Sequence, residues 1–322
     1  MSTKERLLAR LEKCQGDYVS GETLAAEMGV SRNSVWKAVR SLREEGYRID
    51  AATNRGYALS FDSDRLSPSG IERCLRHKAA FSISVRKSVP STNTWARERA
   101  LMGDGEGTLV VAEGQSAGRG RRGRRFFSPE GSGIYLSIVL RPSITAEKSH
   151  LLTCAAAVAC ARAIELVSGK NARVKWVNDI YCDGRKVAGI LTEGSYCLEE
   201  GRFDYAVLGV GINVKLPEAG FPDEISARAG ALFGADAPSV RCKLTAAFLD
   251  EFWELYLRFP DDSFRYEYRR RCFLLGESVT ALVGGRKVCG RVVDMDHDFR
   301  LVLERPDGMR CVLRFENTSI QA

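Results

Sequence analysis

The chain has 322 residues, of which 44% are hydrophobic and 28% charged, and its net charge is +7. This length predicts two or three domains, and the hydrophobic share excludes a wholly disordered chain. The ten cysteines form no Cys-x-x-Cys pair, so a zinc site is not favoured. The N-terminus shows no signal-peptide pattern, and the longest apolar run, residues 151–161, is too short to span a bilayer. We therefore expect a cytoplasmic protein with no membrane partner.

The first 60 residues predict a small helical domain. Residues 2–14 place apolar side chains at helical spacing. Ser20 and Ser31 are each suited to cap a further helix, and Gly29 lies in the short turn between those two helices. Residues 54–57 predict the tip of a β-hairpin. Helix, turn, helix and hairpin in this order are typical of a winged helix-turn-helix.

The second helix of that motif would present polar and basic side chains to a DNA major groove, with Trp36 packed inward. Residues 1–60 carry ten Lys or Arg and eight Asp or Glu, a net charge of only +2. DNA affinity would therefore depend on the local placement of charge and on dimerisation. A protein-interaction module is the open alternative. The residues expected to contact DNA are Gly21, Glu22, Ser31, Arg32, Asn33, Ser34, Lys37 and Arg40.

The centre of the chain contains a run of five arginines and three glycines, Gly118 to Arg125. Apolar, β-prone residues 108–112 and 131–140 flank the run, which predicts a loop between two strands. Glycine allows close backbone approach, and arginine offers a fork of donors to phosphate or carboxylate. The run is not a Walker A loop, because no Gly-Lys-Ser/Thr follows it. We expect it to close over an anion, with a solvated or nucleic-acid-binding loop as the alternative.

Two further segments supply candidate binding groups. Thr92 or Asn93 is expected to cap a helix whose free N–H groups suit a small anion, although a cap without a ligand is the alternative. Residues 173–181 predict one strand, in which Lys175 stands among apolar neighbours and needs an anionic partner. A basic loop and a partly buried lysine suit attack of a carboxylate on a nucleotide α-phosphate. The other expected elements are a helix over 150–167 and strands over 82–86, 187–193 and 205–214.

The last part of the chain changes to short β-prone runs. From residue 277 onward these runs are separated by glycines, which predicts a small β-barrel. The basic segment just before them, residues 265–271, is expected to be a solvated helix face.

Five short blocks resemble the signatures of biotin protein ligases, and with the helical head the chain is similar to the bifunctional bacterial type. One departure is Val177, where the family commonly has proline. The resemblance covers essentially the whole chain. The blocks are Ser91-Thr92-Asn93, Gln115 with Gly118 to Arg124, Lys175-Trp176-x-Asn178-Asp179, Val187 to Leu191, and Gly209-x-Gly211-Ile212-Asn213.

The resemblance implies an α/β multidomain fold. It places a winged helix-turn-helix in residues 1–62, and an α+β mixed-sheet catalytic domain of the biotin/lipoate-ligase type in residues 63–272. An SH3-like β-barrel would follow in residues 273–322.

The implied activity is that of an ATP-dependent, AMP-forming biotin–[acetyl-CoA-carboxylase] ligase. Biotin and ATP, with Mg²⁺, would give biotinyl-5′-AMP, and the biotin would pass to a lysine of the carboxyl-carrier domain. The adenylate would also induce a homodimer that binds the biotin operator as a repressor. Two alternatives stay open, namely a DNA-binding sensor without ligase activity and a lipoate-type ligase on the same fold.

The resemblance also implies residue roles. Lys175, Arg119 and Arg121 would be catalytic. No metal ligand is assigned, and Asp179 is as readily part of a structural turn. Biotin would be bound by Ser91, Thr92, Asn93, Gln115, Arg119, Gly120, Arg121, Lys175, Gly189, Leu191 and Gly211. ATP or the adenylate would be bound by Gly118, Arg119, Arg121, Arg122, Lys175 and Asn178.

Overall fold

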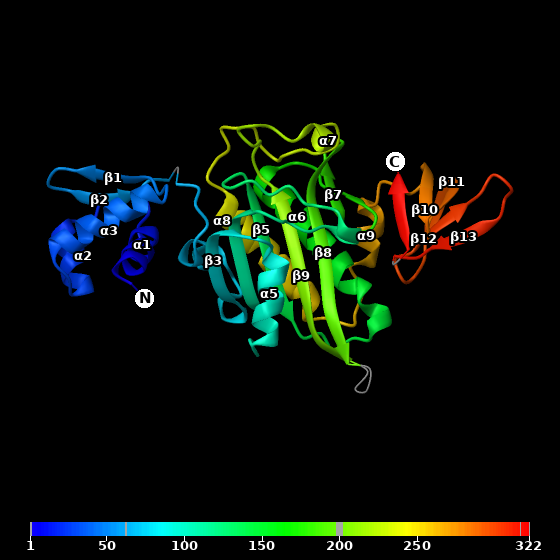
Figure 1. The fold of residues 1–322 in the computed structure, drawn as a ribbon, viewed down its shortest axis with the longest axis horizontal. Helices are drawn as coiled ribbons and strands as arrows, with labels where there is room; N and C mark the ends of the chain where they lie inside the picture. Colours follow the sequence, from blue (N-terminus) through cyan, green and yellow to red (C-terminus); the bar gives the residue numbers. More distant parts are fainter. Residues whose placement is uncertain (1, 62, 198–201, 316, 322) are drawn as a thin grey trace.

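A computed structural model describes residues 2–61, 63–197, 202–315 and 317–321. Three parts follow one another along the long axis of the molecule: a helical head, a central sheet with its helices, and a C-terminal group of strands (Figure 1). Residue 62, at the predicted end of the first domain, lies outside the described residues.

The head contains the three helices and the hairpin that the sequence predicts. Ser2, Ser20 and Ser31 are the N-caps, and each side chain accepts a hydrogen bond from a backbone N–H in the first turn of its helix. The buried side chains of the three helices form a separate small core. The elements are α1 (Thr3–Lys13), α2 (Gly21–Met28), α3 (Arg32–Glu44) and the antiparallel pair β1 (Ile49–Ala52) and β2 (Gly56–Leu59).

A seven-stranded mixed sheet forms the central domain, in the order β3-β4-β5-β9-β8-β7-β6. Only β3 and β4 pair in parallel, and the remaining neighbours are antiparallel. β5 is buried along its whole length, which its continuous apolar run requires. The strands are β3 (Ser82–Val89), β4 (Thr108–Gln115), β5 (Gly133–Leu140), β6 (Arg173–Lys175), β7 (Asp179–Cys182), β8 (Arg185–Cys197) and β9 (Arg202–Asn213).

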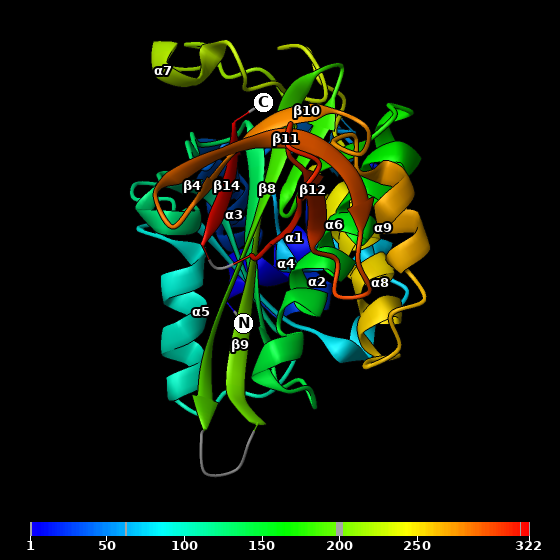
Figure 2. The ribbon, with the colours of Figure 1, turned by 90° about the vertical axis from the view of Figure 1, so that its right-hand side faces the viewer.

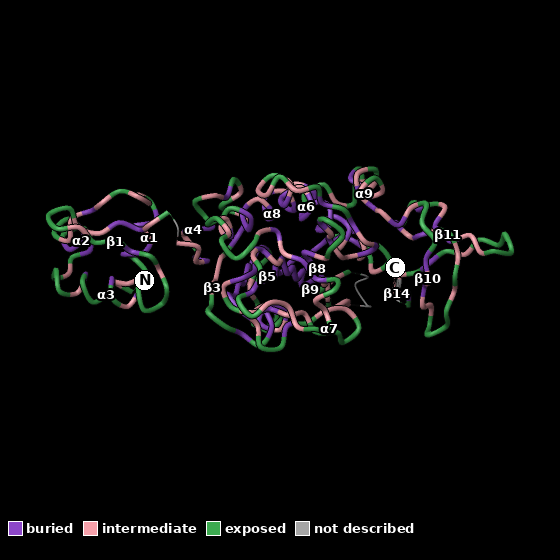
Figure 3. Tube along the Cα trace, turned by 90° about the horizontal axis from the view of Figure 1, so that it is seen from above, coloured by how far each residue is buried: buried purple, intermediate pink, exposed green. Residues whose placement is uncertain are grey.

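Helices cover both faces of this sheet. α5 (Thr92–Leu101) lies on one face, and α6 (His150–Ser168) and α8 (Arg241–Tyr256) lie on the other (Figure 2). Buried residues concentrate between the sheet and this helix pair (Figure 3). Of the described residues, one helical stretch, Ala146–Ser168, is long and apolar enough to cross a membrane, but 67% of its most apolar window is buried, as in a core helix. The short helices are α4 (Pro68–Cys74), α7 (Asp223–Ser226) and α9 (Arg265–Arg271).

Three local expectations were wrong. Residues 173–181 do not form one strand, because the cis-bonded Trp176–Val177 turn separates β6 from β7 and the two strands pair with each other. The N-cap of α5 is Ser91 rather than Thr92 or Asn93, whose side chains bond elsewhere. The basic segment 265–271 is only partly solvated, since Arg271 is mostly buried and pairs with Glu165 and Glu267.

A buried polar junction joins the linker to the sheet. Arg241 of α8 is 1% exposed, and its guanidinium binds Asp64 of the linker at 2.9 Å and Glu113 of β4 at 2.6 Å. Glu113 also accepts the backbone N–H of Leu66 at 2.8 Å. Glu12 of α1 in turn accepts the hydroxyls of Ser67 and Ser69 at the start of α4. The head is therefore held to the central domain by buried polar contacts.

The C-terminal strands form a five-stranded antiparallel sheet in the order β13-β12-β11-β10-β14. The expectation of a small β domain is confirmed, and β14 was not predicted. The strands are β10 (Ser278–Val283), β11 (Arg286–Met295), β12 (Leu301–Glu304), β13 (Arg310–Leu313) and β14 (Thr318–Gln321).

Candidate active site

A cavity of about 830 Å³ lies where the arginine-glycine loop, the N-terminus of α5, the glycines of β8 and β9, and β14 meet. Every residue expected to bind biotin lines it, and so do the expected ATP-binding residues apart from Gly118. Gly118 lies at the base of the loop, where its carbonyl accepts the N–H of Phe126 at 2.9 Å. A Cβ on Gly118 would stand 2.4 Å from the carbonyl oxygen of Phe126, so the closure of the loop requires glycine there.

A chain of hydrogen bonds fixes the polar end of the cavity. The N–H and hydroxyl of Thr92 both lie within bonding distance of Gln115 Oε1, at 2.8 and 3.1 Å. Gln115 donates through Nε2 to Ser128. The fully buried hydroxyl of Ser137 lies 2.9 Å from Thr92 Oγ1 and 2.7 Å from Asn93 Oδ1. Ser137 was not predicted, because a serine inside an apolar strand carries no distinguishing pattern.

Glycines let an aromatic ring approach the sheet closely. A Cβ on Gly211 would stand 2.4 Å from the ring of Phe126, and one on Gly189 would stand 3.1 Å from the same ring. A Cβ on Gly209 would fall 1.9 Å from Asn93 Oδ1. The missing side chains at Gly211 and Gly189 therefore leave the space in which the Phe126 ring lies against the sheet.

The loop is folded against the cavity by its own arginines. Arg119 pairs with Glu193 of β8 at 3.0 Å, and Glu193 also accepts the side-chain N–H of Asn93 at 2.8 Å. Arg121 donates to Asn178 Oδ1 at 3.2 Å and to the carbonyl of Phe315 at 2.6 Å. Burial lowers the pKa of the Arg121 guanidinium from its ordinary value. The segment between β13 and β14 thus holds one of the residues expected to be catalytic.

Two lysines and two arginines make the floor of the cavity strongly basic. Lys175 is half-buried, and burial is the main cause that lowers its pKa; Asp179 raises the pKa, whereas the charges of Lys186, Arg228 and Arg124 lower it further. In the part of the chain that the structure describes it forms no ion pair, although the Asp179 carboxylate acts on it from the paired strand. Lys186 lies 2.6 Å from Asp179. A cavity lined by several cations and a single carboxylate, Asp179, is suited to an anionic ligand.

Lys186 and Arg228 were missed by the sequence reasoning. Lys186 directly precedes the apolar Val187 to Leu191 block, and the argument that singled out Lys175 applied to it equally. Arg228 lies in the connection after α7, where nothing local distinguishes it.

An aromatic stack ties the β6–β7 turn to the C-terminal sheet. The Phe315 ring stacks on Trp176 at 5.3 Å and on His150 at 4.9 Å. The indole N–H of Trp176 donates to the carbonyl of Phe299 at 2.8 Å. The turn that carries Asn178 and Asp179 is therefore positioned by residues more than a hundred positions away.

Comparisons with known proteins complete the assignment. A profile described as "Biotin/lipoate A/B protein ligase family" matches residues 85–213, and one described as "HTH domain" matches residues 3–58. The bifunctional ligase/repressor BirA of Bacillus subtilis is 33% identical over 312 residues, which cover 95% of each chain. The chain belongs to the biotin protein ligase family.

Further relatives place this ligase within the family. The biotin–[acetyl-CoA-carboxylase] ligase of Mycobacterium tuberculosis is 31% identical over 259 residues, 76% of this chain and 93% of the relative. A solved structure of the Aquifex aeolicus biotin protein ligase in complex with biotin and ATP superposes with a TM-score of 0.62 at 25% identity. It covers 74% of this chain and 98% of that chain.

The helical head of the ligase carries the second candidate site. All eight residues expected to contact DNA are exposed or half-exposed, and the apolar side of α3 faces the core of the head. The inward packing predicted for Trp36 was wrong. Its side chain is 49% exposed, and the Arg40 guanidinium lies 5.9 Å from the ring centroid. Trp36 thus stands on the face of the helix that would meet DNA.

Proposed function

We propose that this protein activates biotin with ATP and transfers it to a lysine of the carboxyl-carrier domain of acetyl-CoA carboxylase. Biotinyl-5′-AMP would also act as corepressor, so that the same chain represses the biotin operon. The observation that carries the ligase proposal is the cavity itself, in which a hydrogen-bonding end adjoins a basic floor. The relatives named ligase/repressor and the helix-turn-helix head support the combination of activities.

The two ends of the cavity would bind different parts of the substrates. Thr92, Asn93 and Gln115 would hold the uncharged polar ring of biotin by hydrogen bonds, with the carboxylate directed toward Lys175. A carboxylate oxygen attacks the α-phosphorus of ATP, the new P–O bond forms, and pyrophosphate leaves. Lys175 and Arg121 would stabilise the negative charge on the attacking and transferring oxygens, because fixed cations in a shielded site act most strongly where charge develops.

We propose that magnesium is bound by the triphosphate of ATP rather than by side chains of the protein. Among the residues that the structure describes, no group of three or more His, Cys, Asp or Glu side chains could hold a metal ion. Asp179, the candidate ligand, already pairs with Lys186. The ion would shield the triphosphate charge, and the protein contributes its cations instead of ligands.

A free strand edge supports the proposed ligand-induced homodimer. β8 pairs with β9 through Cys197, but the described part of β7 accompanies it only as far as Gly189. The backbone of Thr192–Cys197 therefore has no strand partner on that side among the described strands. Such an edge can pair with its copy in a second molecule, and Arg119 ties the adenylate loop to Glu193 on this edge.

We propose that the helical head ends at residue 62 and the catalytic domain at residue 272. We also propose an SH3-like barrel for the C-terminal sheet and a cytoplasmic location, which is supported by ten cysteines that are all free.

Three assays test the function. Incorporation of biotin into a carrier domain separates the ligase from a catalytically inert sensor, for which no transfer would be seen. Competition between biotin and lipoate in ATP–pyrophosphate exchange tests the substrate, and preference for lipoate would refute the proposal. A shift assay with operator DNA, with and without biotin and ATP, tests repression, which ligand-independent binding would contradict.

A further inference from the structure

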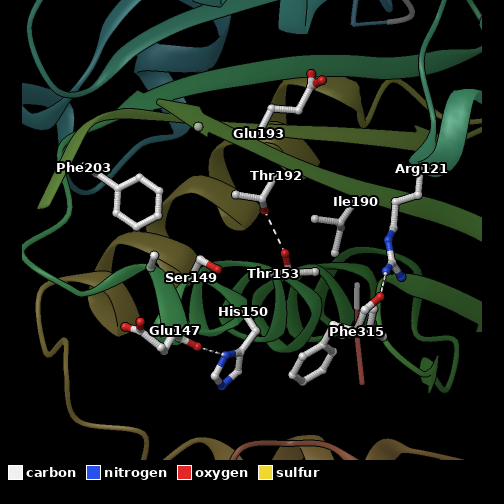
Figure 4. Close-up of a pocket in the computed structure, with 13 residues that line it drawn as sticks. Arg121, Glu147, Ser149, His150, Thr153, Ile190, Thr192, Glu193, Phe203 and Phe315 are labelled. Carbon is white, nitrogen blue, oxygen red and sulfur yellow. Dashed lines mark hydrogen bonds between the residues drawn. The ribbon is translucent and has the colours of Figure 1, made fainter. Parts of the chain in front are cut away.

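A second cavity, of about 350 Å³, lies on the α6 side of β8. It is bounded by Ile190 and Thr192 of β8, by the start of α6 and by Phe315 (Figure 4). Arg121 and Ile190 line both cavities and therefore form the wall between them. Arg121, which is expected to meet the adenylate, is thus reached from this cavity as well.

The lining of this cavity is mixed, with aromatic and aliphatic side chains beside polar ones. Phe203, Phe315 and Ile190 provide apolar walls. Thr153 of α6 and Thr192 of β8 face each other across it, with their hydroxyl oxygens 2.8 Å apart. No polar group of this interior carries a negative charge in the described part of the chain.

The charged and titratable groups around the cavity are asymmetrically placed. Arg121 is the cation at its inner end, and Glu147 stands exposed at the rim. The carboxylate of Glu193 points away from the cavity (Figure 4), toward Arg119. The ring of His150 stacks on Phe315, and its Nδ1 lies 2.9 Å from the Glu147 carbonyl.

We propose that this cavity receives the acceptor lysine of the carrier protein, a primary amine on an aliphatic stem. The proposal rests on the ligase function above. Glu147 would attract the protonated amine at the rim, and the aromatic walls would cover its methylene groups. Deeper in the cavity, desolvation and the nearby Arg121 cation disfavour the ammonium form and favour the neutral amine, which is the nucleophile.

Transfer of the biotinyl group from the adenylate to the amine needs no further reagent. The ammonium first loses a proton to water as it enters. The neutral nitrogen then forms a bond to the acyl carbon of biotinyl-5′-AMP, and the bond between that carbon and the phosphate oxygen breaks. AMP leaves with the electron pair, and the second proton from nitrogen passes to water. The Thr153–Thr192 hydroxyl pair is placed to accept hydrogen bonds from the amine in transit.

A cavity-filling substitution tests the assignment. In T153M the longer side chain occupies the cavity, and we expect single-turnover transfer from preformed biotinyl-5′-AMP to the carrier domain to slow about 100-fold, because displacement of a reacting group by about 1 Å has that effect. Adenylate formation from biotin and ATP, measured in the same preparation, should change less than twofold. The matched control is T53M, the same change at an exposed residue in the hairpin of the helical head, outside the cavity. Equal transfer by T153M and T53M would overturn the proposal.

A charge substitution provides a second readout. T153D places a carboxylate in the cavity, which should stabilise the ammonium and move the pH dependence of transfer about one unit upward. An unmoved profile would contradict the proposal. If T153M also lost adenylate formation, S149F at the cavity mouth would decide, since Ser149 makes no capping hydrogen bond; normal transfer by S149F would refute the assignment. A wild-type protein that forms no adenylate would instead refute the ligase function.

Discussion

Replacement of Lys175 by methionine should separate catalysis from binding. Methionine keeps an unbranched side chain of similar length and removes only the charge. Lys175 has no ion-pair partner among the described residues, so its ammonium is available to the ligand. At 4 Å from a unit negative charge, with an effective dielectric constant of 20, the attraction is about 4 kcal/mol. If this attraction acts in the transition state, the rate of adenylate formation should fall about a thousandfold.

The assay compares two quantities on the same variant. Biotin-dependent ATP–pyrophosphate exchange reports adenylate formation, and calorimetric titration with biotin alone reports ground-state binding. We expect biotin affinity to fall much less than the exchange rate, because Thr92, Asn93 and Gln115 still hold the other end of biotin. Lys170→Met is the matched control, since this lysine pairs with Asp183 away from the cavity. Equal losses of exchange rate and biotin affinity in Lys175→Met would show that the lysine only binds.

Four further outcomes follow from the structure. Because burial and neighbouring cations lower the pKa of Lys175 and the ammonium is the active form, adenylate formation should fall as pH rises through a pKa below the ordinary lysine value of about 10.4; a decline only above that value would contradict this. Trp36→Ala should weaken operator binding and abolish the quenching of tryptophan fluorescence by DNA, with exchange activity intact; unaltered affinity would remove Trp36 from the interface. Arg241→Met removes the buried guanidinium from Asp64 and Glu113, which keep only the 3.9 Å contacts with Lys215 and Arg65, and should lower the free energy of unfolding by about 3–5 kcal/mol in urea titrations; a loss near zero would mean that the junction is solvated. Gly211→Ala should displace the ring above it and reduce biotin affinity, unlike Gly105→Ala in open space, and equal affinities would refute the role of close approach.

The sequence predicted features whose signals are local. Ser20 and Ser31 cap their helices as expected, because a serine before an apolar helical stripe satisfies backbone N–H groups wherever it occurs. The arginine-glycine loop and Lys175 could be identified because charged side chains next to apolar segments need an anionic partner or ligand. These signals depend only on a few neighbouring residues.

Features made by distant contacts were not predictable in this way. The three-residue turn at Trp176 is hidden inside a run that reads as one strand. Trp36 was assigned to the core because exposed tryptophan is uncommon, and only the orientation of α3 shows its solvent side. Phe315 reaches Arg121 across nearly two hundred residues of sequence, a contact for which neither residue carries a local pattern.

The stack of Trp176, Phe315 and His150 has a consequence for engineering this ligase. A domain that merely follows another can be exchanged between relatives or removed, but here the C-terminal sheet supplies both a ring that orders the β6–β7 turn and a carbonyl that holds Arg121. A chimaera joined after residue 272 would pair a catalytic domain with a foreign aromatic surface. The modular unit for transplantation is therefore the whole of residues 63–322, whereas the helical head is joined mainly by polar contacts between α1 and the segment that begins α4.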